Sequence, residues 1–177
     1  MEKRHSSFEL FQDLKTNEIY NSVSRPIIIA DHLRTPENMG SVLRLAGNIG
    51  AQKTLFISDI AHQFKNYKIS KTASGAADKT NWKIITFDEL EDEVPGDYHS
   101  IALETTKQSG SIFEFHFPEK AAFIIGNEVT GIRQELLNKA DQVLHIPIPG
   151  PVSSLNTTHT LSIAMFEWYR QMLRQRP

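Results

Sequence analysis

The feature that most constrains the fold of this chain is a series of short apolar runs at fairly regular intervals. The runs are PIIIA, TLFIS, WKIITF, SIAL, AAFIIG and VLHIPI, at residues 26–30, 54–58, 82–87, 100–103, 121–126 and 143–148. In most of them the apolar residues are continuous and do not alternate with polar ones, which is typical of strands in a parallel sheet that is covered on both faces. The sequence therefore predicts an α/β domain built around a mostly parallel sheet flanked by helices.

The segments between these runs have the length and pattern of crossover helices. We expect helices at about 36–49, 70–78, 88–92, 130–139 and 156–174. The first has Thr35 as its N-cap and Pro36 at its first helical position, where both residue types are favoured. Residues 1–25 precede this pattern, and we expect them to form a helical N-terminal extension to one domain at 26–177.

Composition excludes several classes of protein. The chain has 177 residues and no cysteine, so a disulfide framework and a thiolate metal site are excluded. Its seven histidines show no H-E-x-x-H spacing, and we expect no metal site. No apolar run reaches the roughly 18 residues of a membrane span, and the N-terminus lacks the apolar core of a signal peptide. These observations predict a cytoplasmic protein without a membrane partner.

The net charge of −2 requires that any surface for nucleic acid be local. The candidate cationic clusters are Lys3 with Arg4, Arg34 with Arg44, Lys65 with Lys68 and Lys71, and Arg170 with Arg174 and Arg176. An ordinary solvated face would explain each cluster equally well.

The last predicted helix is apolar on two sides. One stripe at helical spacing consists of Leu161, Ala164, Met165, Trp168 and Met172. A second apolar surface begins with Ile163, Phe166 and Tyr169. Both surfaces require a cover, and the pattern alone leaves open whether the second is covered by the same domain or by another subunit.

Three further segments carry residues that are suited to chemistry. In NMGSVLR, Arg44 lies near Gly40 and Gly47 on the helical wheel. Glycine costs about 1 kcal/mol relative to alanine inside a helix, so a close approach is expected there. The arginine is suited to a phosphate or a hydroxyl, although an exposed arginine on a tightly packed helix is the alternative.

The second segment, GNEVTG, follows the apolar run at 121–125. Gly126 lies where open α/β sheets place ligands, at the carboxyl end of a strand. Glu128 is a candidate partner for Arg44 or for a backbone donor, or a first-turn helix acid. The spacing matches neither G-x-G-x-x-G nor a Walker A loop. The stretch at 102–110 is a candidate wall of an adenosine pocket.

The third segment, IPIPGPVSSLN at 146–156, contains three prolines and a glycine and leads into the last helix. Such a stiff loop at a helix N-terminus suits close backbone approach to a small ligand.

In this order and spacing, the three segments resemble the motifs of the SPOUT RNA methyltransferases, in their SpoU/TrmH branch. The resemblance extends from about Pro26 to Gln171. It implies a fold with a deep C-terminal trefoil knot, a feature that is almost absent from proteins generally. It also implies a homodimer and S-adenosylmethionine as the cofactor, held bent in the knot.

The family pattern assigns roles to residues of this chain. Arg44 would activate the ribose 2′-hydroxyl of RNA, and because a guanidinium stays protonated at pH 7, orientation and charge stabilisation must dominate over base catalysis. The residues expected to shape the site across the dimer interface are Asn38, Glu128, Ser154 and Asn156. Backbone groups around four positions would hold the cofactor, namely Glu104, Gly126, Ile146 and Leu155.

One departure from the family follows the third motif, where Thr157-Thr158-His159-Thr160 replaces small and apolar residues. These polar groups need hydrogen-bond partners if they are buried. The resulting expectation is a 2′-O-ribose methyltransferase acting on RNA, with tRNA favoured over rRNA. The alternatives are a SPOUT enzyme that methylates a base nitrogen, a non-catalytic RNA-binding or assembly protein with this fold, and a flavodoxin-like nucleotide binder.

Overall fold

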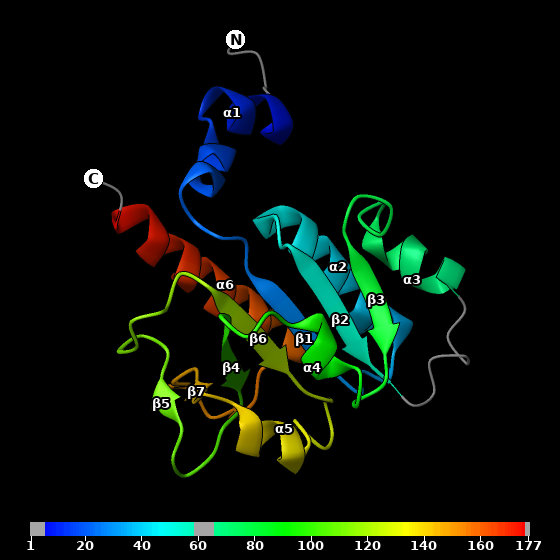
Figure 1. Ribbon diagram of the computed structural model, residues 1–177, viewed down its shortest axis with the longest axis vertical. Helices are drawn as coiled ribbons and strands as arrows, with labels where there is room; N and C mark the ends of the chain where they lie inside the picture. The colour runs from blue at the N-terminus through cyan, green and yellow to red at the C-terminus, as the bar shows by residue number, and fades with distance from the viewer. Residues whose placement is uncertain (1–5, 59–65, 176–177) are drawn as a thin grey trace.

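The computed structural model describes residues 6–58 and 66–175 and has a seven-stranded sheet at its centre (Figure 1). The strands are β1 (Ile27–Asp31), β2 (Lys53–Ile57), β3 (Trp82–Ile85), β4 (His99–Leu103), β5 (Gly110–Ser111), β6 (Ala121–Ile125) and β7 (Gln142–His145). Their order is β3-β2-β1-β6-β4-β7-β5, and each neighbouring pair is parallel. The predicted parallel sheet is confirmed, and only β5, with two residues, was not predicted.

Helices cover both faces of this sheet. The helices are α2 (Pro36–Ile49), α3 (Asn66–Ala73), α4 (Leu90–Glu93), α5 (Gln134–Lys139) and α6 (Thr157–Arg174). One core cluster joins α2, α3 and α6 to the sheet, and a second joins α4 and α5 to the opposite face. Strand β1 contributes Ile28 and Ala30 to the first cluster and Ile27 and Ile29 to the second. This double burial explains why the apolar residues of the strand run continuously and do not alternate with polar ones.

Helix α2 confirms its predicted boundaries. The Thr35 hydroxyl accepts a hydrogen bond from the Asn38 backbone N–H at 3.2 Å, and the helix ends at Gly50 with φ of 70°. A Cβ added to Gly40 would lie 2.5 Å from the Cβ of Thr72, so this glycine permits close packing of α3. The close approach expected at Gly40 is therefore made by a helix and not by a ligand.

Three helices differ from their predicted bounds by two residues or more, and the one expected at 88–92 lies at Leu90–Glu93. The helix expected at 70–78 lies at 66–73, because Ser74 and Gly75 adopt φ angles of 51° and 77° and end it. The helix expected at 130–139 begins only at Gln134, because Asn127 and Gly131 form an antiparallel bridge that closes a tight turn first.

The N-terminal segment forms helix α1 (Ser7–Asp13) and the 3-10 helix η1 (Thr16–Asn21), at the top of Figure 1. Ser6 and Glu9 form a complete capping box at the start of α1. Ile19 of η1 is fully buried in the core cluster of α2 and α6. The segment is helical, whereas the predicted division at residue 25 stays a prediction.

Candidate functional site

A cavity of about 500 Å³ lies at the carboxyl ends of β4, β6 and β7. Three loops build its walls: the segment after β4, the turn after β6, and the long loop that connects β7 to α6. Its lining includes Leu103, Glu104, Gly126, Glu128, Leu144, Ile146, Ser154, Leu155, Asn156, Thr157 and Thr160. Open α/β sheets bind ligands at this edge, so the cavity is the candidate site.

The cavity brings together most of the residues that the sequence singled out. All four predicted cofactor-binding positions line it, namely Glu104, Gly126, Ile146 and Leu155. Three of the predicted catalytic residues line it as well, namely Glu128, Ser154 and Asn156. Asn38 and Arg44 do not belong to its lining in this chain.

The turn after β6 is held rigidly. A Cβ on Gly126 would lie 2.3 Å from the carbonyl carbon of Gly131, so the close backbone approach inside the turn requires glycine. The side chain of Asn127, 6% exposed, accepts hydrogen bonds from the backbone N–H groups of Val129 and Thr130 at 2.8 and 3.2 Å. Its amide group donates to the carbonyl of His32 at 2.7 Å. The turn is thereby tied to the end of β1.

Glu104 reinforces the same turn from the neighbouring strand. Its carboxylate accepts hydrogen bonds from the backbone N–H groups of Ile132 at 3.0 Å and of Thr105 at 3.1 Å. The Glu104 side chain therefore has a structural role at the cavity wall, while the predicted cofactor contact belongs to the backbone around this position.

The start of α6 accounts for the polar residues that depart from the family pattern. Asn156 caps the helix by accepting from the Thr158 backbone N–H at 2.9 Å and from the Thr158 hydroxyl at 2.6 Å. The Thr157 hydroxyl donates to the carbonyl of Gly126 at 3.1 Å, and that of Thr160 donates to the carbonyl of Asn156 at 3.3 Å. Thr157 thus fastens α6 to the turn after β6.

Thr157 and Thr160 both line the cavity, although the sequence reasoning did not assign them to the site. The signal that marks them is their polarity at positions where small or apolar residues were expected. The partner of Thr157 is a backbone carbonyl 31 positions away, which a linear pattern does not reveal, whereas Thr160 bonds to a carbonyl one turn earlier in the chain.

The two remaining predicted residues lie on α2. The side-chain amide of Asn38 donates a hydrogen bond to the Glu128 carboxylate, which connects α2 to the cavity wall. The partner of Glu128 in this chain is therefore Asn38 and not Arg44. Arg44 is exposed, and among the described residues its side chain has no hydrogen bond or ion pair.

The other candidate cations differ in their pairing. Arg170 forms an ion pair with Glu167 at 2.6 Å, and hydrogen bonding from its guanidinium lowers the pKa of the Glu167 carboxyl. Arg34 is exposed and, like Arg44, unpaired among the described residues. Lys3, Arg4, Lys65, Arg176 and the side chain of Lys68 lie outside what the structure describes.

The described residues contain neither a candidate membrane span nor a candidate metal site. No helix within 6–58 and 66–175 is long and apolar enough to cross a membrane. In the same ranges, no group of three or more His, Asp or Glu side chains is arranged to hold a metal ion.

Comparison with known proteins places the chain in a family. The model of the SpoU rRNA methylase family matches residues 25–166. The chain is 29% identical over 175 residues to the mouse tRNA (guanosine(18)-2′-O)-methyltransferase TARBP1, a match that covers 95% of this chain and 11% of that protein. It is 27% identical over 182 residues to the 23S rRNA (guanosine-2′-O-)-methyltransferase RlmB of Neisseria meningitidis serogroup B, covering 95% of this chain and 70% of that one.

Solved structures show the same fold. A chain from a study of 2-OH methylation of C/U34 on tRNA aligns with a TM-score of 0.76 at 24% identity, covering 85% of this chain and 98% of that chain. The SpoU methyltransferase AviRb of Streptomyces viridochromogenes, in complex with AdoMet, aligns with a TM-score of 0.76 at 21% identity. That alignment covers 87% of this chain and 60% of AviRb.

Proposed function

The chain belongs to the SpoU rRNA methylase family, and on that premise we propose that it is an S-adenosylmethionine-dependent RNA methyltransferase. The proposed acceptor is a ribose 2′-hydroxyl, because TARBP1 and RlmB are both named as guanosine-2′-O-methyltransferases. The observation that carries the proposal is the cavity at the carboxyl ends of β4, β6 and β7. The second and third motifs form its walls. The first motif is connected to them by the hydrogen bond from Asn38 to Glu128.

The residues of the cavity fit S-adenosylmethionine. Its volume of about 500 Å³ lies in the range of small-molecule pockets. Leu103, Leu144 and Ile146 provide an apolar wall for an adenine ring, while Glu104 and Glu128 place carboxylates beside a positively charged ligand. When bound, the cofactor supplies a methyl group on a sulfonium centre. The chain would hold it with the 146–156 loop and the turn after β6.

Arg44 would orient the ribose hydroxyl and the adjoining phosphate of the RNA. A guanidinium provides donors in a fixed fork that matches phosphate oxygens, and it stabilises negative charge as the hydroxyl loses its proton. Because Arg44 does not line the cavity of its own chain, we propose that it completes the cavity of a second copy. Ser154 and Asn156 lie at the cavity rim, where they would meet the incoming arginine and ribose.

The second copy has a candidate surface on α6. Leu161, Ala164, Met165, Trp168 and Met172 are buried, as the first stripe predicts. On the other side, Ile163 and Phe166 are 37% and 47% exposed, so the chain itself does not cover them. An isologous dimer would bury this patch against its own copy. A homodimer in the cytoplasm, with the C-terminal trefoil knot of the family, therefore completes the proposal.

Methyl transfer to defined RNA tests the proposal directly. Purified protein would be incubated with labelled S-adenosylmethionine and with unmodified tRNA or rRNA, and the product digested to nucleosides for mass analysis. We expect a 2′-O-methyl nucleoside from tRNA. Label in rRNA alone would remove the tRNA assignment, and label on a base nitrogen would favour the base methyltransferase. No cofactor binding by calorimetry would favour a non-catalytic RNA-binding protein.

A further inference from the structure

A second cavity, of about 520 Å³, adjoins the first at the carboxyl end of β1. The turn after β6 separates the two, because Asn127 and Gly131 line both. The second cavity is therefore a direct neighbour of the proposed cofactor cavity. None of the predicted site residues lines this second cavity.

The floor of the second cavity is a satisfied ion pair. Asp31, 1% exposed, accepts hydrogen bonds from the backbone N–H and the Nε–H of Arg133 at 2.9 and 2.8 Å. The guanidinium of Arg133 also contacts Nδ1 of His32 and lies over the ring of Phe87 at 4.8 Å. Arg133 is therefore committed to the protein, and its charge is balanced by Asp31.

The rim of this cavity includes a residue in a backbone conformation that is uncommon outside glycine. His32 has φ of 53°, in the left-handed region that non-glycine residues rarely occupy. Its backbone N–H donates to Ile57 at 2.9 Å, and its carbonyl accepts from Asn127 at 2.7 Å. Residues kept in such conformations cluster at ligand-binding sites, where the surrounding structure holds them in place.

Two opposite charges that line the cavity have no partner among the residues that the structure describes. Arg34 and Glu135 are both exposed, and neither has a hydrogen bond or an ion pair among the described residues. They also form no ion pair with each other, so their charged atoms are more than 4.0 Å apart. A ligand with acceptors on one edge and donors on another could bridge them.

We propose that this second cavity binds the base of the nucleotide that is methylated, and that Arg34 and Glu135 read it as guanine. The inference rests on the proposed function. Guanine presents the acceptors O6 and N7, which suit a guanidinium. Its N1–H and N2–H₂ groups are adjacent donors that suit the two oxygens of a carboxylate. Adenine has no such donor pair, and a phosphate would be repelled by Glu135.

Nucleotide binding tests this assignment without depending on methyl transfer. The wild-type protein would be titrated with GMP, IMP and AMP in the presence of S-adenosylhomocysteine, with binding followed by ligand-observed NMR. The three probes share their ribose and phosphate, so differences report the base alone. We expect GMP to bind at least about tenfold more tightly than AMP, the discrimination of one bidentate contact. IMP, which lacks the N2 amine, should be weakened severalfold relative to GMP.

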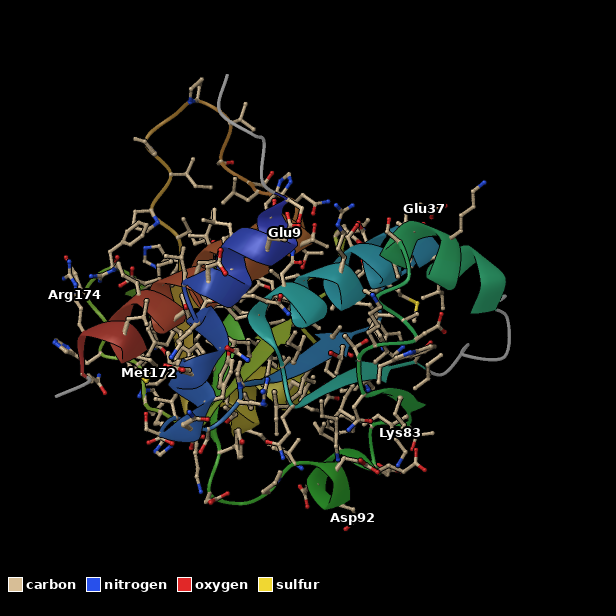
Figure 2. The ribbon with its side chains drawn as sticks, turned by 90° about the horizontal axis from the view of Figure 1, so that it is seen from above. Glu9, Glu37, Lys83, Asp92, Met172 and Arg174 are labelled. Carbon is tan, nitrogen blue, oxygen red and sulfur yellow. The ribbon has the colours of Figure 1, made fainter. Side chains whose placement is uncertain are left out.

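Two variants identify the reading residues. Glu135→Gln should abolish the difference between GMP and IMP, and Arg34→Ala should abolish most of the difference between GMP and AMP. Matched controls are Glu114→Gln and Arg174→Ala, which remove the same charges from exposed positions away from the cavity; the Arg174 side chain points outward in Figure 2. Each protein's thermal unfolding would be recorded to show that it is folded.

The outcomes separate this inference from the proposed function. Equal binding of GMP and AMP by the wild type, or a GMP preference that survives both cavity variants, would overturn the guanine assignment. If the protein methylates RNA but shows no base preference, the guanine assignment is wrong and the proposed function stands. A guanine preference without cofactor binding or methyl transfer would remove the proposed function and the role of the base in it.

Discussion

At the scale of single residues, glycines of the motifs serve packing between backbone segments. Gly40 admits helix α3, and Gly126 admits the backbone of Gly131 inside the turn after β6. Neither requirement involves a ligand directly. Gly47, by contrast, can accept a Cβ, which would make ordinary van der Waals contact with Thr80 at 3.5 Å and with Ala76 at 3.7 Å. We therefore expect substitution by alanine to change stability differently at each of the three glycines.

Gly40→Ala should destabilise the protein by about 1–3 kcal/mol, the usual cost of overpacking a close contact. The added Cβ would meet backbone atoms of Ile69 and Ala73 at 2.9 and 2.8 Å, which cannot move aside as a side chain does. Gly47→Ala is the matched control and should be neutral or stabilising by up to about 1 kcal/mol, through helix propensity. Urea unfolding midpoints of the two variants measure the difference, and equal midpoints would contradict the packing argument.

Arg44→Ala should nearly abolish methyl transfer while leaving cofactor affinity unchanged. Arg44→Lys should rescue poorly, because an ammonium does not reproduce the guanidinium fork. The stability of Arg44→Ala should change by less than about 0.5 kcal/mol, since the side chain is exposed. Labelled methyl transfer to RNA, with Arg174→Ala as the control, measures the effect. Full activity in Arg44→Ala would reject the proposed role of this arginine.

At the scale of elements, short polar contacts hold the segments around the site. Thr157 joins α6 to the turn after β6, and Asn38 joins α2 to Glu128. Near the start of β4, the backbone N–H and the hydroxyl of Ser100 donate hydrogen bonds to the Asp141 carboxylate at 2.8 and 2.7 Å. This contact fixes the end of α5 beside β4 and hence the start of β7.

The contact at Asp141 predicts a dependence of stability on pH. Hydrogen bonds from Ser100 lower the pKa of the Asp141 carboxyl in the folded protein. In the unfolded chain the pKa of this carboxyl is about 3.9. The stabilisation is therefore fully present above about pH 4 and is lost as the pH falls through the folded pKa. The stability gap between wild type and Asp141→Asn should shrink between pH 6 and pH 3. A gap that stays constant over this range, measured by thermal unfolding, would refute the contribution.

At the scale of the whole molecule, the exposed side of α6 and the isolated position of Arg44 both point to a second copy. The rings of Phe166 and Tyr169 lie edge to face with centroids 6.3 Å apart, so they form one aromatic patch next to Ile163. Tyr169 is partly buried against the core cluster that contains Trp168, whereas Ile163 and Phe166 are exposed. Substitution of Phe166 should therefore affect assembly before it affects folding.

Phe166→Glu should convert the protein to monomers and reduce methyl transfer, because a charge on the patch opposes burial against its copy. Sedimentation velocity at micromolar concentration measures the assembly, and circular dichroism checks the fold. Phe113→Glu is the matched control, because this phenylalanine is exposed at 58% and lies outside α6. A wild-type protein that sediments as a monomer would end the dimer proposal.

Mixed dimers test whether Arg44 acts in the partner's cavity. Leu155→Arg should block the cavity, because Leu155 lines it. If the arginine acts across the interface, a dimer of one Arg44→Ala chain and one Leu155→Arg chain contains one complete site. Refolding the two inactive variants together should then recover about a quarter of wild-type activity, from random pairing in a two-fold dimer. No recovery, with mixed dimers confirmed by mass spectrometry, would indicate that Arg44 acts within its own chain.

Several features of the structure could be predicted from local pattern. Continuous apolar runs indicated buried parallel strands. Thr35 and Pro36 predicted the first residue of α2 correctly. The helix near residue 70 was misplaced because positive φ at Ser74 is not written in residue type. Strand β5 was missed because two residues carry no periodicity.

The sequence by itself determined the sheet, the order of the three motifs and the residues that the family pattern assigns to the site. These depend on burial periodicity and on spacing along the chain, which are local properties. Only the tertiary structure decided that Asn38 is the partner of Glu128, that Thr157 holds Gly126, and that Asp31 with Arg133 forms the floor of a second cavity. These contacts join residues 31 to 102 positions apart in the chain, and the parallel topology alone brings them to one edge of the sheet.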